Sequence, residues 1–366
     1  MILFLAVVLH MFCFLVLTWA WNRIDSTALE ATGNELFVSI LIPIRNEEEN
    51  ILSLLRLLEK QDYPRSQFEV VVIDDHSEDL SVDLVNAFSA KSELNVALIS
   101  LKSANGKKAA LEEGVRCARG EVILCTDGDC KVLPSWVSSY AGAFRDDDIK
   151  MVTGPVKMVP KDRFGQYQAL DFFSLIGFGA ASLQLGIPGT CNGANMAYRK
   201  EVFEEMDGYS GNRQIPTGDD EFLLQKIYQV YPDGVKFLKR REAVVSTSPK
   251  KDLKSFLQQR VRWSSKWRYH SNKVVKAAAV WVFVDAILFF ALIFTGIWKY
   301  EPMTLGLFFL RILPECIYLA SVTKFFNERV SSPYYLIISI LYPFYIFFLG
   351  FASIFGTYSW KGRRYS

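Results

Sequence analysis

Long apolar runs near both ends of the chain dominate its hydrophobic pattern. The first covers residues 1–21 and is interrupted only by His10 and Thr18. Three more lie near the C-terminal end, at residues 277–298, 303–322 and 334–358. Each is long enough to cross about 30 Å of hydrocarbon as a helix. The pattern predicts a more polar central region held between transmembrane helices.

The run at residues 1–21 has two interpretations, a signal peptide and a membrane anchor. A signal peptide carries a basic N-terminal region and a small-residue cleavage site. The run has neither before Asn22 and Arg23. We therefore expect residues 1–21 to form an uncleaved transmembrane anchor.

The run at residues 303–322 carries two charges. Arg311 and Glu315 are four residues apart and therefore share one face of a helix. Charges inside a membrane helix are costly and usually face protein or water. A local ion pair, an interfacial helix and a contact with an acceptor all remain open as interpretations.

Basic residues flank the central region on both sides. Arg23 precedes it, and nine Lys or Arg with one acid, Asp252, lie between Lys250 and Lys276. The positive-inside tendency then predicts a multi-pass protein of the cell inner membrane with a cytoplasmic central domain. The cationic tail after Trp360 conflicts with three full crossings. We therefore expect one segment of the membrane region 275–359 to be re-entrant or interfacial.

The central region, residues 35–270, alternates apolar strands with amphipathic helices. Strands are expected at residues 36–43, 68–73, 96–100 and 121–126. Helices are expected at residues 47–61, 81–90 and 107–118. This alternation predicts an α/β domain built on a mostly parallel sheet.

Polar residues follow three of these strands at the point where each ends. They are Arg45, Asn46 and Glu47 after the first strand, Asp74 to Ser77 after the second, and Asp127 and Asp129 after the fourth. Open α/β sheets bind ligands at the carboxyl ends of their strands. Three such clusters predict one shared site.

Two acidic clusters suggest specific chemistry. Asp127 and Asp129, separated by one glycine, can share Mg²⁺ or Mn²⁺ through carboxylate oxygens, although turns also favour these residue types. Asp219 and Asp220, followed by Glu221, can supply a general base for an acceptor hydroxyl or merely cap a helix.

Three further segments have two interpretations each. Asp74 and Asp75 can bind a base or ribose, or cap the next helix. Residues 259–263 can clamp a diphosphate through arginine or lie on anionic lipid as a basic amphipathic helix. The apolar stretch at residues 172–188 can be an acceptor-side segment or a buried helix.

Composition argues against nucleic-acid binding, a disulfide scaffold and a zinc site. The 366 residues carry a net charge of only +2, too little for the basic field of a nucleic-acid-binding protein. The six cysteines show no CxxC spacing, so neither a disulfide scaffold nor a zinc site is expected.

Together these motifs resemble the inverting glycosyltransferase family 2, whose GT-A fold is a Rossmann-like mixed sheet, in its membrane-bound members. The resemblance covers about residues 38–263. It rests on residues 39–48, Asp74-Asp75-His76-Ser77, Gly106-Lys107 with Ala110-Leu111, Asp127-Gly128-Asp129, residues 192–195 with Arg199, Gly218-Asp219-Asp220, and Gln259 with Arg262-Trp263. The family often has T-E-D where this chain has Gly218-Asp219-Asp220, which leaves either aspartate as the base.

The resemblance implies a role for each matching residue. The donor would contact Pro43, Arg45, Glu47, Asp74, Asp75, Lys107, Asp127, Gln259, Arg262 and Trp263. Gly193 and Asn195 would line the acceptor side, and Asp127 and Asp129 would hold Mg²⁺ or Mn²⁺. Asp220, with Asp219, would be catalytic.

The expected function is transfer of a sugar, from a UDP-sugar by resemblance, to a hydroxyl of a lipid or lipid-linked acceptor in the bilayer. Alternatives are a processive polysaccharide synthase, a polyprenyl-phosphate sugar synthase and an inactive membrane-tethered nucleotide-sugar binder. A base at Asp220 favours a hydroxyl over a phosphate acceptor, because a phosphate is already anionic.

Overall fold

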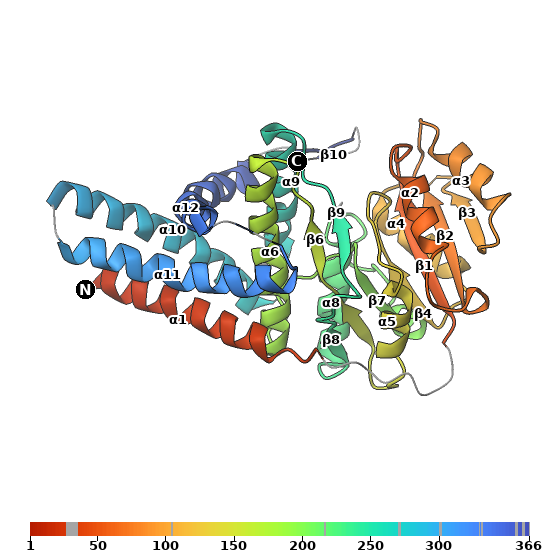
Figure 1. Cartoon of the computed structure of the whole chain (residues 1–366), viewed down its shortest axis with the longest axis horizontal. Helices are drawn as coiled ribbons and strands as arrows, with labels where there is room; N and C mark the ends of the chain where they lie inside the picture. Colours follow the sequence, from red (N-terminus) through yellow and green to blue (C-terminus); the bar gives the residue numbers. More distant parts are fainter. Residues whose placement is uncertain are drawn as a thin grey trace. The chain divides into compact units, whose positions relative to one another are not determined.

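The chain divides into two compact units that are each built from segments far apart in the sequence (Figure 1). The computed structural model describes residues 1–26, 36–103, 105–215, 217–269, 272–299, 302–328, 330, 332–355, 358–360 and 363–365. The sheet unit comprises Ile24–Met158 and Thr190–Ser248. The helical unit comprises Met1–Arg23, Val159–Gly189 and Pro249–Ser366. The division differs from the expected 35–270 domain, because residues 159–189 and those after 249 pack with the helical unit.

The sheet unit is built on a seven-stranded mixed sheet in the order β3-β2-β1-β4-β7-β5-β8. The strands are β1 (Val38–Ile44), β2 (Phe68–Asp74), β3 (Val96–Ser100), β4 (Val122–Cys125), β5 (Met151–Thr153), β7 (Met196–Arg199) and β8 (Val235–Phe237). Strands β1 to β4 pair in parallel, whereas β7 runs antiparallel to both β4 and β5. A second small sheet pairs β6 (Val156–Met158) with β9 (Val245–Thr247).

Burial explains why β1 and β2 read as continuous apolar runs. Every residue of β2 is buried, as are all residues of β1 except Pro43. Strands of a parallel sheet with both faces covered need apolar side chains on both sides. The covering helices are α2 (Ile51–Leu58), α3 (Ser81–Ser89), α4 (Lys107–Cys117), α5 (Trp136–Ala143), α7 (Lys200–Glu205) and α8 (Asp219–Val230).

Helix α2 begins later than the sequence predicts. The expected helix started at residue 47, but residues 45–50 form a loop. The backbone N–H of Glu48 donates to Asp79 Oδ2 at 3.0 Å, and the backbone N–H of Leu80 donates to Glu48 Oε2 at 3.0 Å. Bonds to the loop after β2 therefore replace the first turn of the expected helix.

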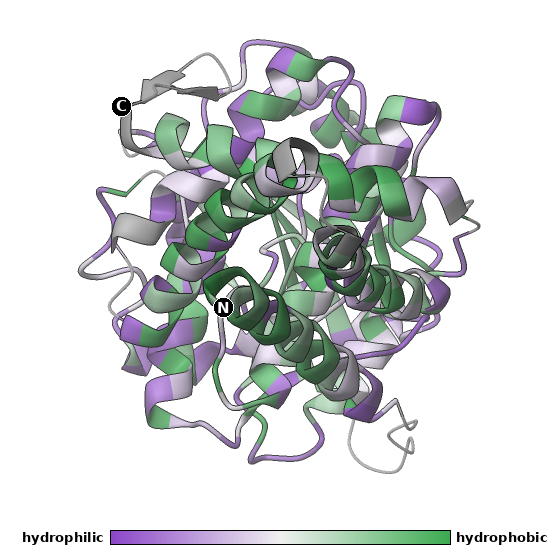
Figure 2. Ribbon diagram, turned by 90° about the vertical axis from the view of Figure 1, so that its left-hand side faces the viewer, coloured by the Kyte–Doolittle hydropathy of each residue, from purple (hydrophilic) through white to green (hydrophobic). Residues whose placement is uncertain are grey.

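The helical unit contains four helices that are long and apolar enough to cross a membrane. They are α1 (Ile2–Arg23), α10 (Lys273–Lys299), α11 (Pro302–Phe325) and α12 (Ser332–Phe355). Figure 2 shows the ribbon that starts at the N-terminus in the hydrophobic colour over most of its length. These helices match the four apolar runs predicted from the sequence.

Two further helices and a hairpin complete the helical unit. They are α6 (Arg163–Gln184), α9 (Leu253–Ser264), and the antiparallel strands β10 (Tyr358–Trp360) and β11 (Arg363–Tyr365). Helix α6 buries Phe172, Phe173 and Ile176, which agrees with the buried-helix interpretation of residues 172–188. The expected fourth apolar run reached residue 358, but α12 ends at Phe355 and Tyr358 opens the hairpin. Lys361 and Gly362 of the cationic tail lie outside the described residues.

Candidate active site

The loops that follow β1 and β2 are joined by hydrogen bonds. The backbone N–H of Asn46 donates to Ser77 Oγ at 3.0 Å, and the backbone N–H of Glu78 donates to Asn46 Oδ1 at 2.8 Å. Asn46 and His76 have positive φ values of 54° and 59°, in the left-handed region that side chains rarely adopt. The two loops thus form one preorganised edge at the carboxyl ends of the strands.

Asp74 and Asp75 lie at this edge, both buried. The Asp74 carboxylate accepts the backbone N–H of Ser77 at 3.1 Å, and Arg45 Nη1 donates to the backbone oxygen of Asp75 at 3.1 Å. The interpretation of these aspartates as caps of the next helix is wrong. Helix α3 has Leu80 at its N-cap position, without a side-chain cap.

The loop after β4 brings Asp127 and Asp129 to the same edge of the sheet. Gly128, between them, packs against the loop after β1, because a Cβ there would lie 3.1 Å from Glu47 Cγ. Burial, together with the negative charges of Asp129 and Asp127, raises the pKa of the Cys130 thiol well above its usual value. The loop therefore brings two carboxylates close to one buried thiol.

Lys107, at the start of α4, connects the two acidic clusters. Its Nζ lies 2.7 Å from Asp127 Oδ1 and 3.1 Å from Asp219 Oδ2. Burial opposes the charge of this ammonium group, but the two carboxylates outweigh burial and raise the Lys107 pKa well above its usual value. Lys107 is therefore a bound cation rather than a solvated surface charge.

The first turn of α8 supplies the second acidic cluster. Its N-cap residue, Gly218, has a positive φ of 79° and contributes no capping side chain. Acids in the first turn are favoured by the helix dipole. Asp219 and Asp220 also reach beyond their own helix, since Asp219 meets Lys107 and the Asp220 Oδ2 accepts the backbone N–H of Gly193 at 3.1 Å.

Gly193 lies where a residue with a Cβ would displace neighbouring side chains. A Cβ at this position would lie 2.9 Å from Asp219 Oδ2 and 3.2 Å from Lys107 Nζ. The third acid, Glu221, has a different task, because its carboxylate accepts a short hydrogen bond from the Thr190 hydroxyl. The backbone near residues 190–193 is thus held against the first turn of α8.

The donor set at Asp127 and Asp129 fits a hard divalent cation. Two carboxylates beside one strand end are the oxygen ligands that Mg²⁺ and Mn²⁺ prefer. The Lys107 ammonium already lies at one of them, which shows that the position accepts positive charge. Among the described residues, no third His, Cys, Asp or Glu joins the two carboxylates.

A family comparison identifies this arrangement. Residues 39–207 match the model described as glycosyl transferase family 2. Residues 39–207 form a family 2 glycosyltransferase domain. Its mixed sheet, with the reversed strand β7 between β4 and β5, is the GT-A fold.

Named relatives of this glycosyltransferase share about half of its chain. Glycosyltransferase AglE of Haloferax volcanii is 26% identical over 183 residues, which are 50% of this chain and 59% of that protein. The beta-monoglucosyldiacylglycerol synthase of Trichormus variabilis is 28% identical over 193 residues, which are 52% of this chain and 41% of that protein. The matches thus span about half the length of these relatives.

A solved structure shares the fold of the glycosyltransferase over nearly its whole length. It is the mannosyltransferase PcManGT from Pyrobaculum calidifontis in complex with GDP-Man and Mn²⁺. The TM-score is 0.63 at 19% identity, over 96% of this chain and 99% of that one. At this identity the likeness shows the fold alone.

Asn195 lies within the scaffold behind the site. It is fully buried, and its Oδ1 accepts bonds from Trp136 Nε1 at 2.9 Å and from the Tyr140 hydroxyl at 2.8 Å. Its Nδ2 donates to the backbone oxygens of Pro155 and Ala243, both at 2.8 Å. The scaffold thus supplies partners to both ends of the amide, and the expected place of Asn195 on the acceptor side stays a prediction.

Gln259, Arg262 and Trp263 lie on α9, in the helical unit. The Trp263 ring packs against Phe172 with centroids 6.0 Å apart, and the guanidinium carbon of Arg260 lies 4.2 Å from the Trp263 ring centre. The expected role of these three residues in donor binding stays a prediction.

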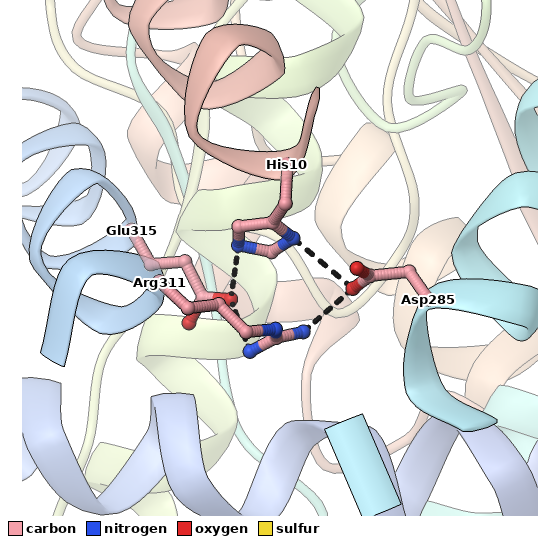
Figure 3. Close-up of polar contacts among 4 residues, drawn as sticks. All are labelled: His10, Asp285, Arg311 and Glu315. Carbon is pink, nitrogen blue, oxygen red and sulfur yellow. Dashed lines mark hydrogen bonds and ion pairs between the residues drawn. The ribbon is translucent and has the colours of Figure 1, made fainter. Parts of the chain in front are cut away.

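A polar cluster shared by α1, α10 and α11 was only half predicted. Arg311 Nη1 and Glu315 Oε1 are 3.1 Å apart, which confirms the local ion pair. Figure 3 shows that His10 and Asp285 complete the cluster: Arg311 Nη2 lies 2.6 Å from Asp285 Oδ2, and His10 lies between the two carboxylates. Asp285 was missed, although it is the single charge in its apolar run.

Proposed function

We propose that this glycosyltransferase transfers a sugar from a nucleoside-diphosphate sugar to a hydroxyl of a lipid or lipid-linked acceptor. One observation carries the proposal. The Lys107 ammonium bridges Asp127, expected at the donor diphosphate, and Asp219, expected beside the acceptor, within 3.1 Å of each. Lys107 therefore connects the residue expected to contact the donor with the residue expected beside the acceptor.

The donor is held at the carboxyl ends of β1, β2 and β4. Asp74 and Asp75 bind the nucleoside at the preorganised loop edge, and Asp127 and Asp129 would hold Mg²⁺ or Mn²⁺. A bound divalent cation would supply positive charge for the departing diphosphate. Lys107 adds a second positive charge at the same place. The family resemblance favours uridine as the base.

The acceptor hydroxyl loses its proton to Asp220. The hydroxyl oxygen forms a bond to the anomeric carbon from the face opposite the diphosphate. The bond to the diphosphate breaks on the other side, and the diphosphate keeps the electron pair. Asp219 is less suited to take the proton, because its carboxylate is already paired with Lys107. A single displacement of this kind inverts the anomeric configuration.

A membrane acceptor is supported by the four apolar helices and by the name of a relative, a beta-monoglucosyldiacylglycerol synthase. The basic residues after 250 and Arg23 favour a cytoplasmic sheet unit in the inner membrane. The helical unit would then lie in the bilayer where the acceptor is dissolved.

Nucleoside diphosphate release tests the proposal. The full chain in lipid vesicles is supplied with a panel of UDP- and GDP-sugars, a lipid acceptor pool, and Mn²⁺, Mg²⁺ or chelator. We expect metal-dependent release with one of the donors. The Asp220→Asn variant should lower turnover by about 10²–10⁴-fold and leave donor affinity within a few-fold of wild type.

The exposed Asp148 provides a matched control, since Asp148→Asn changes an acid of the sheet unit away from the site. Its turnover should equal that of wild type. Undiminished turnover in Asp220→Asn would refute the role of Asp220 as the base. Donor binding without any release in the wild type would indicate an inactive binder. Chain-length analysis of the product separates a single transfer from polymer synthesis.

A further inference from the structure

The connections of the helical unit assign several helix ends to one side of the membrane. Helix α1 ends at Arg23, where the chain enters the sheet unit. Helix α6 is joined to the sheet unit at both ends, through residues 158 and 190, and therefore cannot cross a bilayer. Helix α9 follows the sheet unit directly. We call the membrane face that carries these connections the sheet-unit side.

Helices α10 and α11 form an antiparallel pair that crosses and returns. A Cβ at Gly296 would lie 3.0 Å from Thr304 near the turn, and Asp285 meets Arg311 farther along. The end of α11 meets the end of α1. Phe325 packs on Trp21 with ring centroids 5.6 Å apart, and the hydroxyl of Ser321 donates to Asn22 at 3.0 Å. Helix α11 therefore ends on the sheet-unit side.

Helix α12 starts there and also ends there. Its second half packs along α9, with the rings of Tyr345 and Phe256 stacked at 5.8 Å and Leu349 clustered with Val261. Helix α12 also contacts α6, α10 and α11. Along α10, Phe344 meets Phe290 whereas Phe351 meets Phe283, so the second half of α12 runs toward the start of α10. Strand β10, which follows α12, contacts α9 again. Both α6 and α9 belong to the sheet-unit side. A helix that crossed the bilayer would lose contact with α6 and α9 after its first turns.

The direction of α12 differs from that of the other long helices. Figure 1 shows α1, α10 and α11 running alongside one another, whereas α12 is seen nearly along its own axis. Its 24 residues make it about 36 Å long, enough to cross if it were upright. Length therefore does not decide its course, but its direction and contacts do.

The charges of the connections agree with this course. Lys324 lies in the last turn of α11, Arg329 follows that helix in the sequence, and Arg363 and Arg364 lie in the C-terminal tail. The positive-inside tendency favours both segments in the cytoplasm. A crossing by α12 would place them on opposite sides of the membrane.

We infer that α12 does not cross the bilayer but lies embedded in the leaflet on the sheet-unit side. The chain then crosses three times, through α1, α10 and α11, and its C-terminal hairpin emerges on the side that carries the sheet unit. The partner of the outer face of α12 is the acyl region of that one leaflet. Large apolar side chains that α12 exposes include Leu336, Ile337, Ile340, Leu341, Phe344 and Phe348.

Reporter fusions test this course without reference to catalysis. Green fluorescent protein, which fluoresces in the cytoplasm, and alkaline phosphatase, which is active in the periplasm, are fused after Lys299, after Glu328 and after Ser366. We expect the fusions after Glu328 and Ser366 to give the same reporter signal and the fusion after Lys299 to give the opposite one. Opposite signals after Glu328 and Ser366 would overturn the inference.

The complete chain provides the second measurement, because a truncation can misassemble. A protease site and an epitope tag are appended after Ser366. Exposed Cys117 of the sheet unit marks its side through labelling by an impermeant maleimide. The tag should be cleaved in the vesicles whose Cys117 is labelled. Cleavage in vesicles of the opposite orientation alone would show that α12 crosses.

Discussion

The polar cluster of Figure 3 gives a quantitative prediction for membrane assembly. His10 Nδ1 lies 3.0 Å from Asp285 Oδ2, and His10 Nε2 lies 2.8 Å from Glu315 Oε1. Because both ring nitrogens lie within 3.0 Å of a carboxylate oxygen, the cluster favours the doubly protonated, positively charged imidazole. With Arg311, two cations balance two anions. His10→Leu removes one cation and leaves a net negative charge buried among three helices.

The size of the stability loss distinguishes the loss of a hydrogen bond from the burial of an uncompensated charge. Loss of the single hydrogen bond from His10 Nδ1 to Asp285 within a bilayer costs about 0.6 kcal/mol, which is the average measured value. Loss of one partner from a buried ion pair costs about 3–5 kcal/mol, because a charge is left uncompensated. His10 is 4% exposed, so we expect His10→Leu to lower the free energy of unfolding by about 3 kcal/mol.

Charge balance can be restored in the same cluster. The double variant His10→Leu/Glu315→Gln has one cation, Arg311, and one anion, Asp285. We expect it to recover about 2 kcal/mol relative to His10→Leu, as measured by equilibrium SDS unfolding in bicelles. Thr18→Leu is the matched control, because the Thr18 hydroxyl donates to the backbone of its own helix, at Phe14 O, 2.7 Å away. A double variant no more stable than His10→Leu would refute the charge-balance reasoning.

Other predictions concern the sheet unit. Lys107→Ala should weaken donor binding in calorimetry by about tenfold or more, because a bound cation at the diphosphate is lost. Gly193→Ala should lower turnover while keeping the melting temperature near wild type, since its Cβ would meet the Asp219 carboxylate at 2.9 Å; Gly142→Ala, where nothing lies within 4 Å, should leave turnover unchanged. Glu69 is buried, but hydrogen bonds, including those from Arg119, lower its pKa below 4.5. The ionised Glu69 therefore stabilises the folded protein above the pKa that this carboxyl has in the unfolded chain, and this stabilisation is lost as the pH falls through its lower folded-state pKa. Glu69→Gln should therefore flatten the acid limb of a curve of unfolding free energy against pH.

The strands and their ends were predictable because the signals are local. Strands β1 and β2 are continuous apolar runs, and Asp74 and Asp127 follow directly where a strand ends. The carboxyl ends of parallel strands meet at one sheet edge, so the grouping of these acids followed from topology alone. The family model confirms the family that these motifs indicated.

The parts that could not be predicted depend on contacts between distant segments. His10 and Asp285 are 275 residues apart, and no periodicity in the sequence pairs them. The burial of Asn195 depends on rings from α5 that lie more than 50 residues away. The course of α12 is likewise invisible in its length and composition, because an embedded helix and a crossing helix can have the same apolar sequence.

Mass spectrometry of lipids from cells with and without the protein tests most directly whether a lipid is the acceptor. We expect a glycolipid that carries one added sugar, present with the wild-type chain and absent with Asp220→Asn. The same lipid should form when purified protein, donor and Mn²⁺ or Mg²⁺ are combined in vesicles. An unchanged lipid profile, together with a soluble polymer or no sugar transfer at all, would contradict a lipid hydroxyl as the acceptor.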